Sequence, residues 1–108
     1  MLLSPPCSVP AFRHGTTREL GPASVNYTCL YNLLAYPAGV VSTTSVRQDE
    51  VATRPRSREK MLEVARLIDD GSAGLPCGVQ VTAEPGREDD VLSVMAALEE
   101  SGNAGDAV

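Results

Sequence analysis

Apolar residues recur with helical spacing in three stretches of the chain. The first is expected to begin near Ser24, a candidate N-cap, and to end by Tyr36, because Pro37 disfavours helical geometry at the residue before it. Its apolar positions are Tyr27, Leu30, Tyr31 and Leu34. These are positions i, i+3, i+4 and i+7, which is the spacing of one face of an α-helix.

Two further stretches show the same periodicity. One is expected to run from Arg58 to Asp70, with Gly71 in the left-handed conformation that glycine favours after a helix. Its apolar positions are Met61, Val64, Ala65 and Ile68, widened by Leu62 and Leu67. The other is expected from Glu88 to Glu100, where acidic residues in the first turn complement the helix dipole. Its apolar positions are Val91, Val94, Met95 and Leu98.

Short runs rich in β-branched residues predict strands between these helices. Residues 38–44 and 77–83 are expected to be full strands, and Leu2-Leu3 the end of another. The order β-α-β-α-β-α indicates an α/β fold with largely parallel strand pairing. Parallel sheets are normally buried on both faces, so two strands and a stub suggest a fragment of a larger sheet.

The other segments are expected to be irregular. Three prolines fix the backbone and remove donors in residues 4–12, and the loop is expected to continue over residues 14–21. A polar loop is expected over residues 47–57. Residues 1–100 are interpreted as part of an incomplete domain, and residues 101–108 as a flexible tail.

Composition argues against nucleic-acid binding. The chain has 108 residues, of which 43% are hydrophobic, and its formal net charge is −5. Nucleic-acid binding requires a basic surface that displaces counterions. The basic run from Arg54 to Lys60 has no interleaved aromatic residues, so we interpret it as a solvated loop that leads into a helix.

No apolar run approaches the length of about 20 residues that a membrane-spanning helix needs. Met1-Leu2-Leu3 is followed at once by a serine and two prolines, so it is too short to be the core of a signal peptide. The sequence therefore predicts no membrane segment in this chain. The cytoplasm is the default location, although the location of any longer parent protein is not indicated.

Residues capable of catalysis or metal binding are few and scattered. His14 is the single histidine and is expected in a surface loop, so a zinc site is not predicted. The acids of residues 88–90 suit a helix start, whereas Asp69 and Asp70 lie at a helix end with no explanation beyond solubility. Three widely spaced cysteines without a CxxC pair are expected to be free, buried thiols: Cys7, Cys29 and Cys77. No catalytic residue, metal or cofactor is predicted from these patterns.

Several stretches nevertheless resemble a known enzyme family. Residues 74–92, GLPCGVQVTAEPGREDDVL, resemble the C-terminal GLP-x-G-V-Q segment of amidase signature enzymes and the turn and helix after it. Residues 27–46, YTCLYNLLAYPAGVVSTTSV, are similar to the preceding block and most resemble the fatty acid amide hydrolase branch. The opening LLSPPCSVPAF resembles the strand-and-proline segment before it. The resemblance covers nearly the whole chain.

The resemblance implies an amide hydrolase with a large mixed sheet flanked by helices, of which this chain is the C-terminal portion. The family uses a serine nucleophile, a second bridging serine and a lysine base. None of the three can be assigned here, because Lys60 lies on a charged helix flank and no Gly/Ser-rich signature is present. The chain is therefore expected to be inactive alone. Its partner would be the missing N-terminal part of the amidase domain, and the complete enzyme would act on a small-molecule amide without a cofactor.

The resemblance also implies that the chain contributes to the wall of an acyl-chain channel. Tyr36, Ser72 and Ala73 are the candidate substrate-pocket residues, because they lie beside motifs that flank this channel in the family. Gln80 is expected to bond neighbouring backbone from within a strand. An alternative stays open, in which the chain is a free-standing α/β interaction or ligand-binding module without catalysis.

Overall fold

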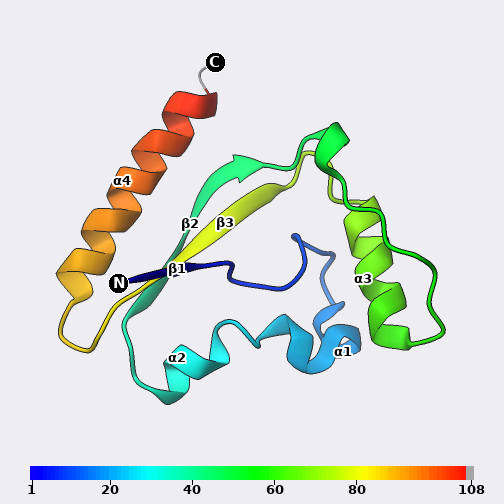
Figure 1. Ribbon diagram of the computed structural model, residues 1–108, viewed down its shortest axis with the longest axis horizontal. Coiled ribbons are helices and arrows are strands. Elements are labelled where there is room, and N and C mark those ends of the chain that lie inside the picture. Colours follow the sequence, from blue (N-terminus) through cyan, green and yellow to red (C-terminus); the bar gives the residue numbers. More distant parts are fainter. Residues whose placement is uncertain (107–108) are drawn as a thin grey trace.

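A three-stranded antiparallel sheet organises the computed structural model, which describes residues 1–106 (Figure 1). β3 (Pro76–Thr82) lies in the middle, with β1 (Leu2–Ser4) on one side and β2 (Ala38–Ser45) on the other. β1 places Leu2 opposite Thr82. The N-terminus is therefore paired with a strand that lies near the other end of the chain.

The mixed α/β composition and the order of the main elements are confirmed, but the prediction of largely parallel pairing is wrong. Both strand pairs are antiparallel. The physical reason is the path of residues 47–75, which leave and rejoin the sheet at the same end. The amide of Val46 donates to the carbonyl of Leu75 at 2.9 Å, and the amide of Gly74 donates to the carbonyl of Val46 at 2.7 Å. A connection closed in this way reverses the chain and does not cross over the sheet.

The first expected helix is much shorter in the structure. α2 contains only Cys29–Leu33, and Ser24 belongs to a preceding 3₁₀ turn, η1 (Gly21–Ser24), where its hydroxyl donates to the carbonyl of Gly21. The assignment of Ser24 as an N-cap is therefore wrong. The helix ends early because Ala35 adopts a positive φ of 57°, which turns the chain before Pro37.

A further short helix lies in a segment that the sequence suggested was loop. α1 (Thr17–Leu20) buries Leu20 almost completely, with 1% of its surface exposed. Residues 47–57 are irregular apart from the 3₁₀ turn η2 (Gln48–Glu50), as expected.

The second and third expected helices are present. α3 (Lys60–Asp70) buries the predicted positions Val64, Ala65 and Ile68, whereas Met61 is exposed. Gly71 has φ −94°, so the expected left-handed conformation is absent there and occurs instead at Gly74, with φ 82°.

α4 (Glu88–Asp106) covers one face of the sheet. Its predicted apolar positions pack against Val81 and Ala83, and Val91 is buried among them. A Cβ atom at Gly39 would collide with the sulfur of Met95, so the absent side chain leaves room for the end of the Met95 side chain against β2. α4 also extends beyond the expected end at Glu100. Of the expected tail, residues 101–106 are helical and residues 107–108 lie outside the described residues, so its flexibility stays a prediction.

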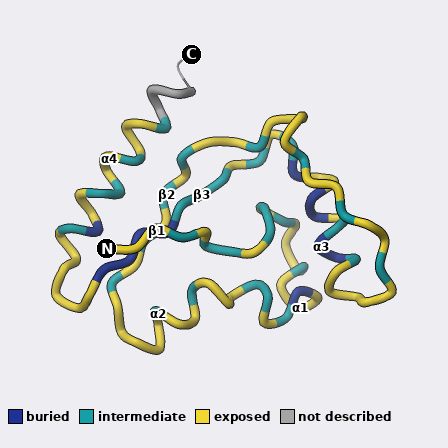
Figure 2. The backbone as a smooth tube through the Cα atoms, in the orientation of Figure 1, coloured by how far each residue is buried: buried dark blue, intermediate teal, exposed yellow. Residues whose placement is uncertain are grey.

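Buried apolar side chains form two separate clusters. Figure 2 marks the buried positions along the backbone. The first joins Leu20 to Val64 and Ile68, with Val9 and Phe12 beside it. The second joins the sheet to α4. The molecule is consequently a flat slab with extents of 44 × 39 × 20 Å.

On the face of the sheet away from α4, Gln80 of β3 is bonded to the segment around Tyr27. Its side-chain amide donates to the carbonyl of Tyr27 at 2.8 Å and to the hydroxyl of Ser4 at 3.1 Å. This confirms the expected role of Gln80. Two residues further along the same face, Thr82 is 2% exposed and its hydroxyl has no hydrogen-bond partner among the described residues.

Gln80 and Thr82 therefore make a matched pair of substitutions. Gln80→Met should lower the free energy of unfolding by about 1–3 kcal/mol, because it removes two hydrogen bonds and leaves the carbonyl of Tyr27 without its donor. Thr82→Val removes a hydroxyl that bonds nothing, so its effect should be neutral or slightly stabilising. Urea unfolding followed by circular dichroism measures both. A larger loss for Thr82→Val than for Gln80→Met would contradict this assignment.

Candidate functional site

The structure does not bring the sequence-predicted pocket residues together. Tyr36 precedes β2 and is partly exposed at 36%, with its ring 6.5 Å from that of Tyr31. Ser72 and Ala73 precede β3, at the opposite end of the β2–β3 ladder. Seven residues of strand separate the two ends, which corresponds to roughly 24 Å. A pocket role for Tyr36, Ser72 or Ala73 stays a prediction.

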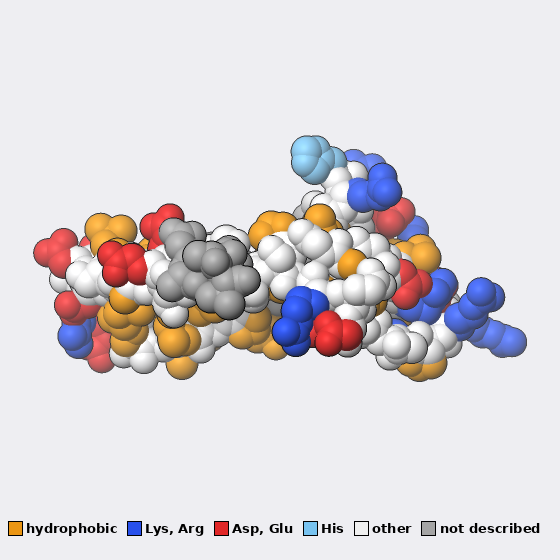
Figure 3. Space-filling view, turned by 90° about the horizontal axis from the view of Figure 1, so that it is seen from above, with side chains coloured by type: hydrophobic (Ala, Val, Ile, Leu, Met, Phe, Trp, Pro, Cys, Tyr) orange, Lys and Arg blue, Asp and Glu red, His pale blue; other side chains and the backbone are white. Residues whose placement is uncertain are grey.

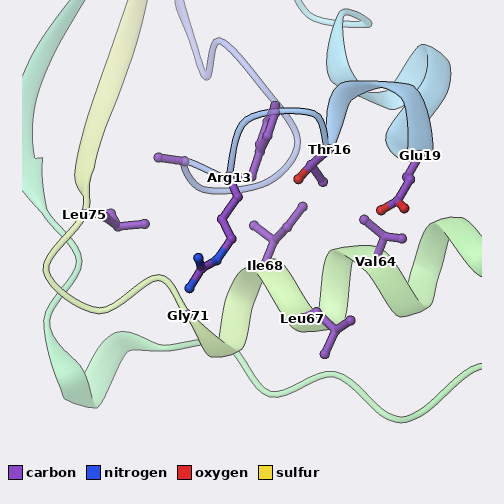
Figure 4. A pocket seen from close by; sticks show the side chains of 10 residues that line it. Arg13, Thr16, Glu19, Val64, Leu67, Ile68, Gly71 and Leu75 are labelled. Carbon is purple, nitrogen blue, oxygen red and sulfur yellow. The ribbon is translucent and has the colours of Figure 1, made fainter.

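A groove of about 550 Å³ lies between α3 and the chain around α1 (Figure 4). Its apolar lining consists of Ala11, Phe12, Val64, Leu67, Ile68 and Leu75. Three polar side chains line the side opposite α3, and Arg13 extends from there towards Gly71, which ends that helix. The groove therefore combines an apolar floor with one cation (Arg13) and one anion (Glu19).

In the sequence, Ser72 and Ala73 lie between Gly71 and Leu75, two residues that line this groove. Ser72 is 1% exposed, and its hydroxyl donates to the carbonyl of Asp69 at 2.6 Å. A hydroxyl held in this way caps the end of α3, so it is not free to act as a nucleophile in this arrangement.

Residues 11–19 contribute a part of the groove that the sequence pattern did not predict. A signal was present, because Thr16 and Glu19 match the S/T-x-x-E pattern of a helix start and Gly21 follows. A helix does begin after Thr16, as this pattern predicts, but the side chain of Thr16 makes no capping hydrogen bond. The buried Leu20 then orients α1 against α3.

Asp69 is buried next to the groove and pairs with Arg54. The Nε atom of Arg54 donates to the Oδ2 atom of Asp69, whose side chain is 2% exposed. This pairing gives the acid at the end of α3 a structural role that the sequence did not indicate. It also corrects the interpretation of residues 54–60 as a fully solvated run, because Arg54 anchors that segment to the helix.

Loss of this ion pair should destabilise the chain. Arg54→Met would leave a carboxylate buried without its partner and should lower the free energy of unfolding by about 2 kcal/mol, less than for a fully buried pair because Arg54 is 39% exposed. Arg58→Met is the control, because Arg58 is exposed and makes no ion pair among the described residues. Equal effects of the two substitutions in urea unfolding would exclude a structural role for the pair.

Glu63 accepts hydrogen bonds from two directions. The Nε atom of Arg66 donates to it at 3.0 Å, and the amide of Ser57 donates at 3.2 Å. The pKa of Glu63 is lowered from 4.5 to about 2. The hydrogen bond from Arg66 is the main cause, and the hydrogen bond from Ser57 is the second. Arg66 also donates to Asp70 at 3.1 Å. Glu63 is therefore held ionised by its hydrogen bonds, which does not suit it to act as a general acid.

The lowered pKa of Glu63 makes stability depend on pH in a defined window. The unfolded chain takes up a proton at Glu63 near pH 4.5, whereas the folded chain does so only near pH 2. The stabilisation is thus complete above that window and is lost as the pH falls through it. Glu63→Gln should flatten this part of the pH profile of unfolding, and Glu100→Gln, on the exposed side of α4, should retain it. An unchanged slope in Glu63→Gln would contradict the assignment.

The remaining candidate residues form no site. His14 is exposed in a turn, as expected, and projects from the surface in Figure 3. All three cysteines are free, as expected, but Cys29 is exposed on α2 and Cys7 and Cys77 are only partly buried, so the prediction of buried thiols is wrong. Within residues 1–106 no three His, Cys, Asp or Glu side chains are grouped closely enough to hold a metal ion. No helix described by the structure is long and apolar enough to cross a membrane.

Comparison with known proteins decides the family. The family model described as "Amidase" matches residues 1–92. The chain belongs to the amidase family. This amidase chain is 35% identical over 102 residues to a protein named Fatty acid amide hydrolase 1 from Caenorhabditis elegans. It is also 35% identical over 80 residues to Fatty-acid amide hydrolase 1 from Sus scrofa. No solved structure matches it significantly.

The amidase chain spans only a small part of these relatives. The match to the Caenorhabditis elegans protein covers 92% of this chain but 18% of the relative. The match to the Sus scrofa protein covers 70% of this chain and 14% of the relative. The resemblance to the amidase signature family and to its fatty acid amide hydrolase branch is thereby confirmed.

Proposed function

We propose that the chain is the C-terminal part of an amidase that hydrolyses carboxylic amides, with fatty acid amides as the substrate class. The observation that carries this proposal is the asymmetric match to the Caenorhabditis elegans relative, which takes in 92% of the chain and 18% of that protein. The name of that relative supplies the substrate class.

We also propose that the chain is catalytically incomplete. Acyl transfer by a serine needs a base within hydrogen-bond reach of the nucleophile. Lys60 is exposed at the start of α3 and bonds no serine among the described residues. Ser72 is buried and donates its hydrogen bond to a backbone carbonyl. Both observations support a role in which the catalytic groups come from elsewhere in the domain.

The contribution of the chain would then be architecture and pocket wall. Tyr36 at one end of β2, and Ser72 with Ala73 at the other end, would each line a different part of an acyl-chain channel. Their separation by the length of the ladder is compatible with a long, apolar substrate. A short amide would not reach from one to the other.

Two assays test the proposal. The isolated chain should neither react with a fluorophosphonate serine probe nor hydrolyse oleamide, and labelling of this chain would overturn its catalytic incompleteness. A chimera, in which the chain replaces its matching segment in the Caenorhabditis elegans relative, should hydrolyse oleamide. A folded chimera that reacts with the probe but does not release oleate would argue against the substrate class.

A second candidate is the free-standing ligand-binding module, and the groove between α1 and α3 is the observation that favours it. Its volume is in the range of small-molecule sites, and its lining is mostly apolar. A module of this kind would bind an apolar ligand without any other part of an amidase, and the chimera would then be inactive.

A further inference from the structure

Helix α2 buries none of its residues against the part of the chain that the structure describes. None of its residues is buried, and Figure 2 shows it as exposed along almost its entire length. Leu33 is 80% exposed and Leu30 51%. We define the α2 face as the exposed large hydrophobic residues of this region: Val25, Tyr27, Leu30, Leu33, Leu34 and Tyr36.

A five-residue helix of this kind is not stable by itself, because isolated helices shorter than about 12 residues are marginal in water. The bond from Gln80 to the carbonyl of Tyr27 attaches the start of the region to the sheet, and its end leads directly into β2 at Ala38, so the helix between them is held only at its two ends. Clustered exposed apolar side chains of this kind mark an interaction surface. The α2 face therefore requires a covering surface that the described chain does not supply.

The α2 face also lacks charge. No Asp, Glu, Lys, Arg or His occurs from Gly21 to Val46. By contrast, α4 carries acids on its outer side, and Figure 3 shows most charged side chains at the two ends of the slab. Depletion of charge is the compositional signal of the buried centre of a protein interface.

The chain as a whole exposes more surface than a compact protein of its mass, and the excess gives the area that a contact could cover. The chain exposes 7403 Å². A compact monomer of 11.4 kDa would expose about 5,800 Å². The excess is about 1,600 Å², and a standard interface buries about 800 Å² on each partner. The radius of gyration of 15.3 Å likewise exceeds the value of about 13 Å for a compact chain of this length. This excess fits an extensive, permanent contact.

We propose that the α2 face is the surface on which the remainder of the amidase domain docks. This inference rests on the proposed function, because it takes the unmatched part of the relatives, 82% of the Caenorhabditis elegans protein (100% less the 18% matched), as the occupant. That occupant presents an apolar, uncharged surface to α2. The opposite face of the sheet is already covered by α4 and is not part of this contact.

Cys29 provides a natural probe, because its thiol is exposed on α2. The 108-residue chain is co-expressed with the part of the Caenorhabditis elegans relative that lies outside the matched segment. Maleimide labelling of Cys29, located by peptide mass, should be slowed about tenfold or more in the complex relative to the free chain.

Substitutions separate this face from the others. Leu33→Asp, and Leu30→Asp as a second variant, should weaken association about tenfold or more, because each places a charge in an apolar contact. Leu92→Asp is the matched control on α4, since Leu92 is 63% exposed and lies outside the α2 face. It should bind as the unsubstituted chain does. Circular dichroism of each free variant verifies that the fold is retained.

Several results would overturn the inference. These are a complete lack of association, a complex in which Cys29 reacts as fast as in the free chain, and equal weakening by Leu33→Asp and Leu92→Asp. Self-association of the free chain that protects Cys29 would assign the face to a second copy and would also overturn it. The oleamide assay on the chimera is independent of these results, so failure of the proposed function can be distinguished from failure of the docking surface.

Discussion

The antiparallel pairing of β3 with both β1 and β2 is the interaction on which the rest of the structure depends. It joins Leu2 and Ala38 to the same residue, Thr82. The alternation of side chains along β3 then directs Val81 into the cluster with α4 and Gln80 towards Tyr27. A slip of one residue would exchange these two faces, placing an amide among apolar side chains. The register of one strand thus fixes both layers of the sheet.

Local periodicity predicted the parts of this fold whose packing is local. The apolar faces of α3 and α4 and the positions of β2 and β3 follow from residue spacing alone. Strand direction does not, because it depends on where residues 47–75 rejoin the sheet. The length of α2 was overestimated at both ends. Residues 21–24 form the 3₁₀ turn η1 and the helix begins only at Cys29, whereas a positive φ at Ala35 ends it, and alanine is not a residue that signals this conformation.

At the candidate site, too, features set by neighbouring residues could be predicted, and contacts between distant segments could not. The motif that placed Ser72 and Ala73 near a pocket lies within the segment that the family model matches, yet the groove beside them is completed by residues 11–19, which follow a proline-rich stretch and were expected to be loop. Asp69 could not be explained from its neighbours, because its partner Arg54 is 15 residues away in a segment without periodicity. Contacts of this kind become visible only when the chain is folded.

The residues that identify the family in this chain owe their pattern to packing. Gly39 has no side chain, so the sulfur of Met95 can lie against β2, and Gly74 adopts a left-handed conformation where its amide closes the connection to Val46. A larger residue at Gly39 would force the flexible end of the Met95 side chain to move, and a side chain at Gly74 would strain the turn. Gly74 therefore tolerates little change whether or not a catalytic group is nearby. A segment can therefore resemble its family through its fold alone, because the constraint that it records is the close fit of helix, strand and turn.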